Sequence, residues 1–324
     1  MRIVRQTLDE TERRIAAVLL ASPRAGWREV GACLGLSERT VVRRAAPLYA
    51  DGTLRATVVR NPVHFPGTVP LVLRVRCRPQ RIGRIAAALA RRPDTVWVDI
   101  LGSGTELSAA FFLDGPDART ALLLRDLPAT DAVESWTAHT LLRVFPTAFR
   151  WTSGLLTAAE EARLAPGPTA PPGPPVPPHT VDGALIAALT EDGRATYTEL
   201  ARRADTTALT ARRRLDTLLR AHVLRSATEV DLALLGARTE AMLWIGVRPG
   251  RLEEAARTLA AHPQVRFTAA TTGPATLLAA VAASGLDALY TFLTTVVGPL
   301  PGITAIETTP LLATVKRTGL VRRS

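Results

Sequence analysis

The pattern of apolar and polar positions predicts two short helices joined by a tight turn in residues 27–48. On each helix the apolar residues recur at spacings of three and four, namely Trp27, Val30 and Leu34 on the first and Val41, Ala45 and Leu48 on the second. Gly31 supplies a small residue where the two helices come closest. The turn occupies residues 35–37, and Ser37 is a good N-cap because its hydroxyl accepts from a free amide of the first turn. The pattern is that of a helix-turn-helix, whose second helix enters the DNA major groove.

The same pattern recurs after a shift of 170 residues, from Trp27 to Tyr197. The second copy has its apolar positions at Tyr197, Leu200, Ala204, Ala211, Leu215 and Leu218. Ala201 stands in place of Gly31, and Thr207 in place of the cap Ser37. Identical pairs are Glu29 and Glu199, Thr40 and Thr210, Arg43 and Arg213, Arg44 and Arg214, Leu48 and Leu218, Leu54 and Leu224, and Arg55 and Arg225. Core, cap and basic positions repeat together, which indicates an internal duplication.

A second kind of pattern follows each helix-turn-helix. The segment Thr7-Leu8-Asp9 opens a helix that runs to about Leu20, with Asp9 as its cap, and this helix precedes the first helix-turn-helix. A short strand or wing at Leu54–Arg60 follows the helix-turn-helix. The next elements are the strand Val69–Cys77, the helix Arg81–Arg91, the strands Thr95–Leu101 and Glu106–Leu113, and the helix Asp117–Leu127. The segment Asp131–Val144 follows and ends in extended chain. This βαββαβ order predicts a four-stranded antiparallel sheet with both helices on one face. The other face needs a cover, so we expect a partner sheet.

The fold class is therefore α+β: a tandem repeat of a winged helix-turn-helix and a ferredoxin-like βαββαβ domain of RAM type. The expected divisions are 1–62 and 180–236 for the winged helix-turn-helix domains, 66–150 and 239–324 for the sheet domains, and 151–179 for a linker. The linker's second part, 165–179, is rich in proline and predicts a semi-rigid extended spacer of roughly 45 Å. A recognition peptide for an SH3-like partner is the alternative reading of this stretch.

Composition and charge narrow the class further. The 324 residues carry a net charge of +11, almost all of it from arginine, whose planar fork suits phosphates and guanine edges. No apolar run is long enough to cross a bilayer, and we expect a cytoplasmic protein without a secretory signal. The two cysteines, Cys33 and Cys77, show no metal or disulfide spacing and are expected to be buried. The histidines show no metal spacing either, so we expect no metal and no cofactor.

These residues resemble the Lrp/AsnC family, the feast/famine transcriptional regulators. The family's opening helix has its counterpart at Leu8-Asp9, Glu12 and Ile15, and more loosely at Val181-Asp182 and Leu189. The segment Gly193-Arg194 through Thr198-Glu199-Leu200-Ala201 is similar to the family's entry into the second helix, and Arg44 and Arg214 match an arginine late in its recognition helix. The resemblance implies a βαββαβ domain that senses a small molecule, with an amino acid or related metabolite as effector, and that forms oligomers.

The chain also departs from the family. Members usually carry one winged helix-turn-helix domain, here called a reader, and one sheet domain, and they pair as dimers. This chain therefore resembles a dimer whose two subunits are joined in one polypeptide, and we expect homo-oligomers of such pseudo-dimers. The family's acidic turn between the second and third strands is replaced here by Gly102, Ser103, Gly104 and Thr105, and by Thr272, Gly273, Pro274 and Ala275. Glycine would let a ligand approach the backbone amides of these turns, and a plain hairpin turn is the alternative.

Helix phase assigns the DNA contacts, with double-stranded DNA as the partner. The caps Ser37 and Thr207 begin the two recognition helices. Base-edge candidates are Glu38, Arg39, Thr40 and Arg43 in the first reader and Leu209, Thr210 and Arg213 in the second. Backbone candidates are Arg44, Arg55 and Arg60, and Arg212, Arg214 and Arg225. Because Glu38-Arg39 corresponds to Ala208-Leu209, we expect an imperfect palindrome with half-sites about one or two helical turns apart.

Two other functions remain open. The sirohaem decarboxylases share this architecture, but usually place histidines near the entry to the third strand, where this chain has Thr105-Glu106-Leu107 and Ala275-Thr276-Leu277. A non-specific architectural DNA-binding protein would bind every sequence with the same steep salt dependence. No nucleophile elbow, phosphate loop, metal motif or distinctive carboxylate pair stands out, and we therefore expect a regulator and not an enzyme.

Overall fold

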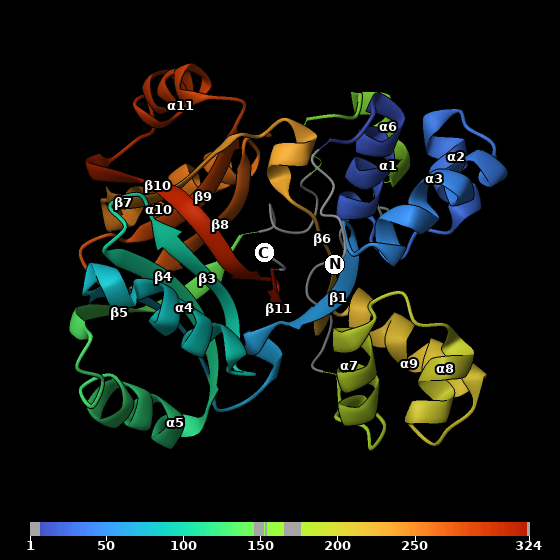
Figure 1. The fold of residues 1–324 in the computed structure, drawn as a ribbon, viewed down its shortest axis with the longest axis horizontal. Helices are drawn as coiled ribbons and strands as arrows, with labels where there is room; N and C mark the ends of the chain where they lie inside the picture. Colours follow the sequence, from blue (N-terminus) through green and yellow to red (C-terminus); the bar gives the residue numbers. More distant parts are fainter. Residues whose placement is uncertain (1–6, 146–151, 153, 165–175, 323–324) are drawn as a thin grey trace. The chain divides into compact units, whose positions relative to one another are not determined.

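The computed structural model describes residues 7–145, 152, 154–164 and 176–322 and divides the chain into two compact units (Figure 1). The reader unit comprises Met1–Phe65 and Thr152–Leu235, and the sheet unit comprises Pro66–Trp151 and Gly236–Ser324. Each unit combines one segment from each half of the chain. The Pro-rich part of the expected linker lies mostly outside the described residues, so the spacer and its alternative are both outside what the structure describes.

The reader unit contains two copies of a three-helix arrangement followed by a strand. The first copy is α1 (Glu10–Ala21), α2 (Trp27–Leu34), α3 (Glu38–Ala50) and β1 (Arg55–Arg60); the second is α7 (Asp182–Glu191), α8 (Tyr197–Arg203), α9 (Ala208–Arg220) and β6 (Leu224–Glu229). The predicted caps are confirmed, since the side chains of Asp9, Ser37 and Thr207 accept from the amides of Glu12, Thr40 and Thr210. Both helix-turn-helix motifs are therefore present as predicted.

The strand after each helix-turn-helix pairs with its counterpart in the other copy. β1 and β6 form an antiparallel ladder from Arg55 opposite Glu229 to Arg60 opposite Leu224. The sequence predicted the strands but not their partners, and the ladder makes the two readers one unit. The segment between residues 151 and 179 also contributes a helix, α6 (Ala158–Leu164), which packs beside α2.

The sheet unit contains the predicted βαββαβ order twice. The first copy is β2 (Thr68–Cys77), α4 (Ile82–Arg91), β3 (Thr95–Leu101), β4 (Glu106–Asp114), α5 (Gly115–Ala121) and β5 (Val133–Val144). The second is β7 (Thr239–Val247), α10 (Leu252–Ala260), β8 (Val265–Thr271), β9 (Leu277–Ala283), α11 (Leu286–Phe292) and β10 (Ile303–Arg317), followed by β11 (Leu320–Val321). Short 3-10 or π segments occur at Pro62–His64, Pro79–Arg81, Leu122–Asp126, Leu232–Leu235, Pro249–Arg251 and Leu293–Val297.

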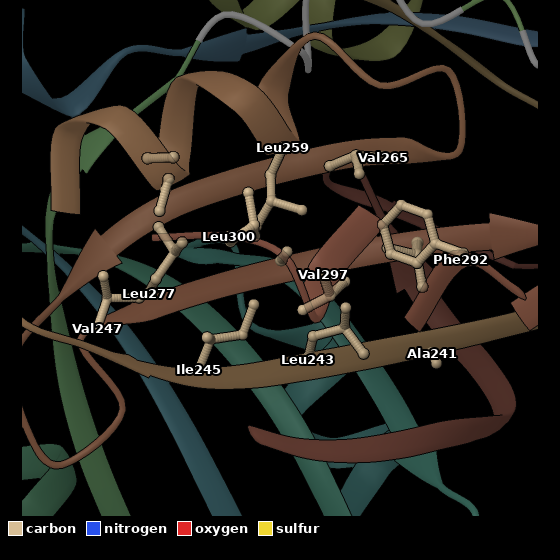
Figure 2. Packing of buried hydrophobic residues seen from close by; sticks show 14 of the residues in the cluster. Ala241, Leu243, Ile245, Val247, Leu259, Val265, Leu277, Phe292, Val297 and Leu300 are labelled. Atoms are coloured by element: carbon tan, nitrogen blue, oxygen red, sulfur yellow. The ribbon is translucent and has the colours of Figure 1, made fainter. Parts of the chain in front are cut away.

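The two sheets are continuous with each other because each last strand serves both halves. β5 pairs with β2 and then with β8, while β10 pairs with β7 and then with β3. Alternate residues of each strand point to opposite faces. On β7, Leu243 and Ile245 pack under α10 and α11 (Figure 2), whereas Met242 and Trp244 join Val72 in a second core that draws on both sheets. The partner sheet that the sequence required is thus the other half of the same chain.

Candidate functional site

The recognition helices α3 and α9 are anchored by a buried apolar face and present polar residues outward. Val41, Ala45 and Leu48 are fully buried, as are their counterparts Ala211, Leu215 and Leu218. The helix starts are reinforced by a contact between Ser37 Oγ and Thr40 Oγ1 at 2.8 Å and by the equivalent contact between Thr207 Oγ1 and Thr210 Oγ1 at 2.9 Å. The four hydroxyls therefore act first as capping groups, and Thr40 and Thr210 are half-buried.

The outward faces carry the expected base-edge candidates. Glu38, Arg39 and Arg43 are exposed on α3, and Leu209, Arg212 and Arg213 are exposed on α9. Among the residues that the structure describes, none forms an ion pair with Arg39, Arg43 or Arg213. These three guanidinium groups are thus available to a ligand outside the chain.

Two arginines expected at the DNA backbone bind carboxylates of their own reader instead. Arg44 Nη1 lies 2.7 Å from Asp9 Oδ2, and Arg214 Nε lies 2.6 Å from Asp182 Oδ1. Arg214 also donates to the carbonyl of Pro177 at 2.7 Å. Each arginine ties the recognition helix to the start of its first helix, and the expected phosphate contacts of Arg44 and Arg214 stay predictions.

The wing arginines are also placed differently from the expectation. Arg55 and Arg225 lie on β1 and β6, which pair with each other, and both side chains are half-buried. Burial lowers the pKa of Arg225 to about 10. Arg60 places its guanidinium carbon 5.2 Å from the centre of the Phe65 ring. A strand used for pairing between readers does not form a free wing, and we therefore leave Arg55, Arg60 and Arg225 out of the proposed DNA surface.

A reciprocal pair of arginines that sequence reasoning overlooked joins the two readers. Arg24 donates to the carbonyls of Gly193 and Ala195 at 2.5 and 3.1 Å, and Arg194 donates to the carbonyls of Pro23 and Ala25 at 2.7 and 3.0 Å. The repeat offset of 170 residues that relates Trp27 to Tyr197 also relates Arg24 to Arg194, so the duplication contained the signal. The contact fixes the two helix-turn-helix motifs against each other.

The two expected effector turns are exposed but their glycine-rich backbone is already engaged. The amide of Gly102 donates to the carbonyl of Pro310 on β10 at 2.7 Å, and that of Gly104 to Leu101 at 2.9 Å. In the second turn the amide of Thr272 donates to the carbonyl of Thr140 on β5 at 3.0 Å. We therefore correct the expectation that these three amides await a ligand, because each turn packs against the last strand of the other half.

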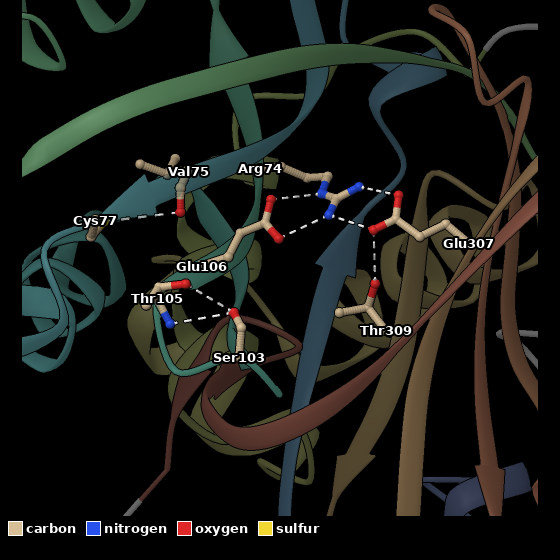
Figure 3. Close-up of polar contacts among 8 residues, drawn as sticks. All are labelled: Arg74, Val75, Cys77, Ser103, Thr105, Glu106, Glu307 and Thr309. Atoms are coloured by element: carbon tan, nitrogen blue, oxygen red, sulfur yellow. Dashed lines mark hydrogen bonds and ion pairs between the residues drawn. The ribbon is translucent and has the colours of Figure 1, made fainter.

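Side chains around these turns are held by contacts within each turn and, at His139, by a contact between the halves. His139 Nδ1 lies 2.9 Å from the carbonyl oxygen of Thr272, and a Cβ on Gly273 would come within 2.7 Å of that nitrogen. Near the first turn, Ser103 Oγ lies 3.1 Å from Thr105 Oγ1 (Figure 3). Pro274 and Ala275 complete the second turn, where Thr271 Oγ1 donates to the carbonyl of Ala275 at 2.6 Å. In the first turn Ser103 is exposed and Thr105 is half-buried.

An ion-paired arginine between the sheets was not anticipated from the sequence. Arg74 on β2 contacts Glu106 on β4 and Glu307 on β10, each at 2.8 Å, and its guanidinium carbon lies 5.0 Å from the centre of the Trp244 ring (Figure 3). Trp244 is the repeat counterpart of Arg74. The second half therefore has no arginine at the equivalent position, and this ion-paired arginine distinguishes the two halves.

The described part of the chain offers neither a cluster of metal ligands nor a membrane-spanning helix. No group of three or more His, Cys, Asp or Glu side chains there is arranged to hold a metal ion. None of the helices described is long and apolar enough to cross a membrane.

Comparison with known proteins adds the following matches. The family model described as "AsnC-type helix-turn-helix domain" matches residues 180–219, and the one described as "Lrp/AsnC ligand binding domain" matches residues 240–321. The HTH-type transcriptional regulator LrpA1 of Halobacterium salinarum is 34% identical over 122 residues, which cover 37% of this chain and 86% of that protein. An uncharacterized HTH-type transcriptional regulator of Pyrococcus abyssi is 29% identical over 143 residues, covering 44% of this chain and 90% of the relative.

Among solved structures, that of the siroheme decarboxylase NirDL is similar across almost the whole chain. The TM-score is 0.59 at 13% identity, with 96% of this chain and 93% of the other covered. At that identity the likeness is one of fold. The matches to the two regulators thus cover less than half of this chain but most of each regulator. The match to the decarboxylase covers nearly all of both chains.

Proposed function

Since this chain belongs to the Lrp/AsnC family of HTH-type transcriptional regulators, we propose that a single chain acts as a pseudo-dimer and binds an operator through both of its readers. Membership of this family identifies the chain as a transcriptional regulator. The pseudo-dimeric action, the operator and the effector of this chain are our proposals.

The observation that carries the proposal is that both recognition helices belong to one compact unit. The β1–β6 ladder and the reciprocal contacts of Arg24 and Arg194 join the readers. Helix-turn-helix proteins bind two half-sites with two such helices held at a fixed distance. Here one chain supplies what a homodimer supplies with two.

Electrostatics support the same conclusion. The chain carries a net charge of +11, and Arg39, Arg43 and Arg213 are exposed on the recognition helices. Neutralising phosphates releases counterions, which makes binding strong at low salt and steeply salt-dependent. Arg43 and Arg213 occupy equivalent positions and are thus the natural pair to test.

The test is the binding of labelled duplexes, selected from a random library with the pure protein, by fluorescence anisotropy. We expect the double substitution Arg43→Ala and Arg213→Ala to weaken binding by at least about tenfold and to lower the salt slope by roughly two. The matched control is Arg84→Ala with Arg119→Ala, which removes the same charge from exposed positions of the sheet unit. Unchanged operator affinity in the first variant would refute the proposal.

The two alternative functions, a non-specific architectural DNA-binding protein and a sirohaem-decarboxylase-like enzyme, predict different outcomes. A non-specific architectural protein would bind selected and scrambled duplexes alike. The likeness to siroheme decarboxylase NirDL concerns the fold alone, and His139 is buried with one ring nitrogen against a backbone carbonyl. A shift in the absorption spectrum of an added iron porphyrin, together with absent operator binding, would favour the decarboxylase alternative.

We further propose that the sheet unit binds a small effector at the exposed side of the turns 102–105 and 272–275. Ser103 and Thr105 offer hydroxyls there, whereas the amides of Gly102, Gly104 and Thr272 are engaged. An amino-acid panel in a thermal-shift assay should yield at least one ligand that stabilises the protein, and Ser103→Ala should weaken that ligand. We also expect the chains to associate, which light scattering with and without the ligand will test.

A further inference from the structure

The two recognition helices present different chemistry at equivalent positions. Residues 38 and 39 are Glu and Arg, whereas residues 208 and 209 are Ala and Leu. We propose that the operator is asymmetric, with a G·C pair read by the first reader and a thymine methyl at the matching place read by the second, so that the chain binds in one orientation. This inference rests on the proposed DNA-binding function.

The first reader leads with groups that suit a G·C pair. Glu38 and Arg39 begin α3, and both side chains are exposed. An arginine binds the O6 and N7 acceptors of guanine with two hydrogen bonds, and a glutamate accepts from the N4 amine of cytosine. No described residue forms an ion pair with Arg39, so its donors need not leave a partner to reach a base.

The second reader leads with an apolar surface. Leu209 is 57% exposed on α9, so its apolar side chain is available to a partner outside the chain. An apolar side chain in the major groove contacts the C5 methyl group of thymine. Ala208, which stands in place of Glu38, has no polar side-chain atom that could bind a base.

On α9, the arginine that follows Leu209 most closely is Arg212, which contacts residues of its own reader. Arg212 Nε lies 3.9 Å from Asp216 Oδ2, and its guanidinium carbon lies 5.9 Å from the centre of the Tyr197 ring. The equivalent residue of the first reader is Val42, and Ala46 stands in place of Asp216. Arg212 thus lies one helical turn after Leu209 and is not the positional equivalent of Arg39.

The supporting framework is the same in both readers. The caps Ser37 and Thr207, the exposed Arg43 and Arg213, and the ties from Arg44 and Arg214 are equivalent. The difference is thus confined to the leading residues. Because each chain contains one reader of each kind, an asymmetric site distinguishes its two orientations, which a homodimer cannot do.

The experiment compares three synthetic operators that are palindromic except at the leading position of each half-site. One has two G·C pairs there, one has two A·T pairs, and the mixed operator has one of each. We expect the wild-type chain to bind the mixed operator roughly ten- to a hundredfold more tightly than either symmetric one. Ala208→Glu with Leu209→Arg should shift the preference to the operator with two G·C pairs. Glu38→Ala with Arg39→Leu should shift it to the operator with two A·T pairs.

The outcomes separate this inference from the proposed function. Equal affinity for mixed and symmetric operators, or exchange variants whose preferences do not change, would overturn the asymmetric readout while leaving DNA binding intact. Absence of binding to every duplex would overturn the proposed function itself. All four exchanged side chains are exposed, and melting temperatures of the variants will show that the readers remain folded.

Orientation can be observed directly with a tethered cleavage reagent. Cys33 and Cys77 are buried, so Arg28→Cys at an exposed position of α2 offers a single accessible thiol for an iron chelate. We expect strand cleavage beside the G·C half-site only. Equal cleavage beside both half-sites of the mixed operator would contradict a single orientation.

Discussion

Arg24 and Arg194 make the same contact in opposite directions between the two readers. Each guanidinium donates to two carbonyl groups in the turn that contains the other, and each lies against the aromatic residue that follows that turn. The guanidinium carbon of Arg24 is 5.6 Å from the centre of the Tyr197 ring, and that of Arg194 is 4.1 Å from the centre of the Trp27 ring. The two readers thus meet through a pair of equivalent contacts related by the internal repeat.

Removing Arg194 from this pair should weaken the contact between the readers without unfolding the sheet unit. We expect Arg194→Ala to speed amide exchange in β1 and β6 by roughly ten- to a hundredfold, because hydrogen bonds from a charged donor contribute about 1.5–3 kcal/mol. Hydrogen-exchange mass spectrometry gives the measurement. Peptides from β2 and β7 serve as the internal control, and Arg28→Ala, at an exposed position of α2, as the matched variant.

Arg194→Lys refines that test, because a lysine keeps the charge but lacks the planar fork. We expect it to behave more like the alanine variant than like the wild type. Exchange in β1 and β6 that stays at the wild-type rate in both variants would show that the strand ladder alone holds the readers together.

Gly31 should resist substitution although it lies in a helix. A Cβ at this position would come within 2.5 Å of the carbonyl oxygen of Leu36 in the turn. Replacing a helical glycine by alanine ordinarily stabilises by up to about 1 kcal/mol, but overpacking costs about 1–3 kcal/mol. We therefore expect Gly31→Ala to lower the melting temperature of the reader unit, as measured by calorimetry.

Gly183 provides the matched control in the same unit. It lies in α7, and nothing lies within 4 Å of a Cβ built there. Gly183→Ala should leave the melting temperature unchanged or raise it. If both variants shift the melting temperature in the same direction, the turn contact of Gly31 does not determine its identity.

The Arg214–Asp182 pair should make the second reader sensitive to acid. Burial alone would raise the pKa of Asp182, but hydrogen bonds from Arg214 and from the amide of His179, with the charge of Arg214, hold it below its ordinary value. The carboxylate therefore stabilises the fold above the unfolded-state pKa of about 3.9, and this contribution disappears as the pH falls through the lower folded-state pKa. Urea unfolding from pH 3 to 7 will measure it.

The variant Asp182→Asn isolates the effect. We expect it to be less stable than the wild type at pH 5–7, with the difference narrowing below about pH 4. Asp131→Asn, at an exposed loop position of the sheet unit, is the control and should follow the wild-type curve. A stability difference that does not depend on pH would mean that the carboxylate's charge plays no part.

Cys33 should report whether α6 stays docked on the first reader. Its Sγ lies 3.6 Å from the carbonyl oxygen of Glu160, and burial, with the Glu160 carboxylate, raises the pKa of its thiol. Glu160 also forms an ion pair with Arg14. We expect Glu160→Ala to increase labelling of Cys33 by a thiol reagent at pH 8 by about tenfold, since undocking exposes the thiol.

Cys77 is the internal control for that measurement. It is buried in the sheet unit, where burial and the Glu134 carboxylate raise the pKa of its thiol to about 11. Peptide mapping distinguishes the two sites. Faster labelling of both cysteines would indicate general destabilisation, and unchanged labelling of Cys33 would show that α6 does not protect it.

The exposed faces of the recognition helices could be predicted well, because burial follows helix phase. The spacing of Val41, Ala45 and Leu48 leaves Arg39 and Arg43 on the other side, and the structure exposes them. The same reasoning could not separate Arg43 from Arg44. Only the fold brings Asp9, distant in sequence, to within 2.7 Å of Arg44.

The sequence by itself determined the helices, their caps, the order of strands and the duplication, because these depend on neighbours within a few residues or on direct similarity between segments. Tertiary structure alone decided the partners. It paired β1 with β6, carried β10 from β7 to β3, and placed the amides of Gly102 and Thr272 against strands of the other half. The reason is physical: a periodic pattern specifies which side of an element is buried, but the group that meets it is selected by packing between segments far apart in the chain.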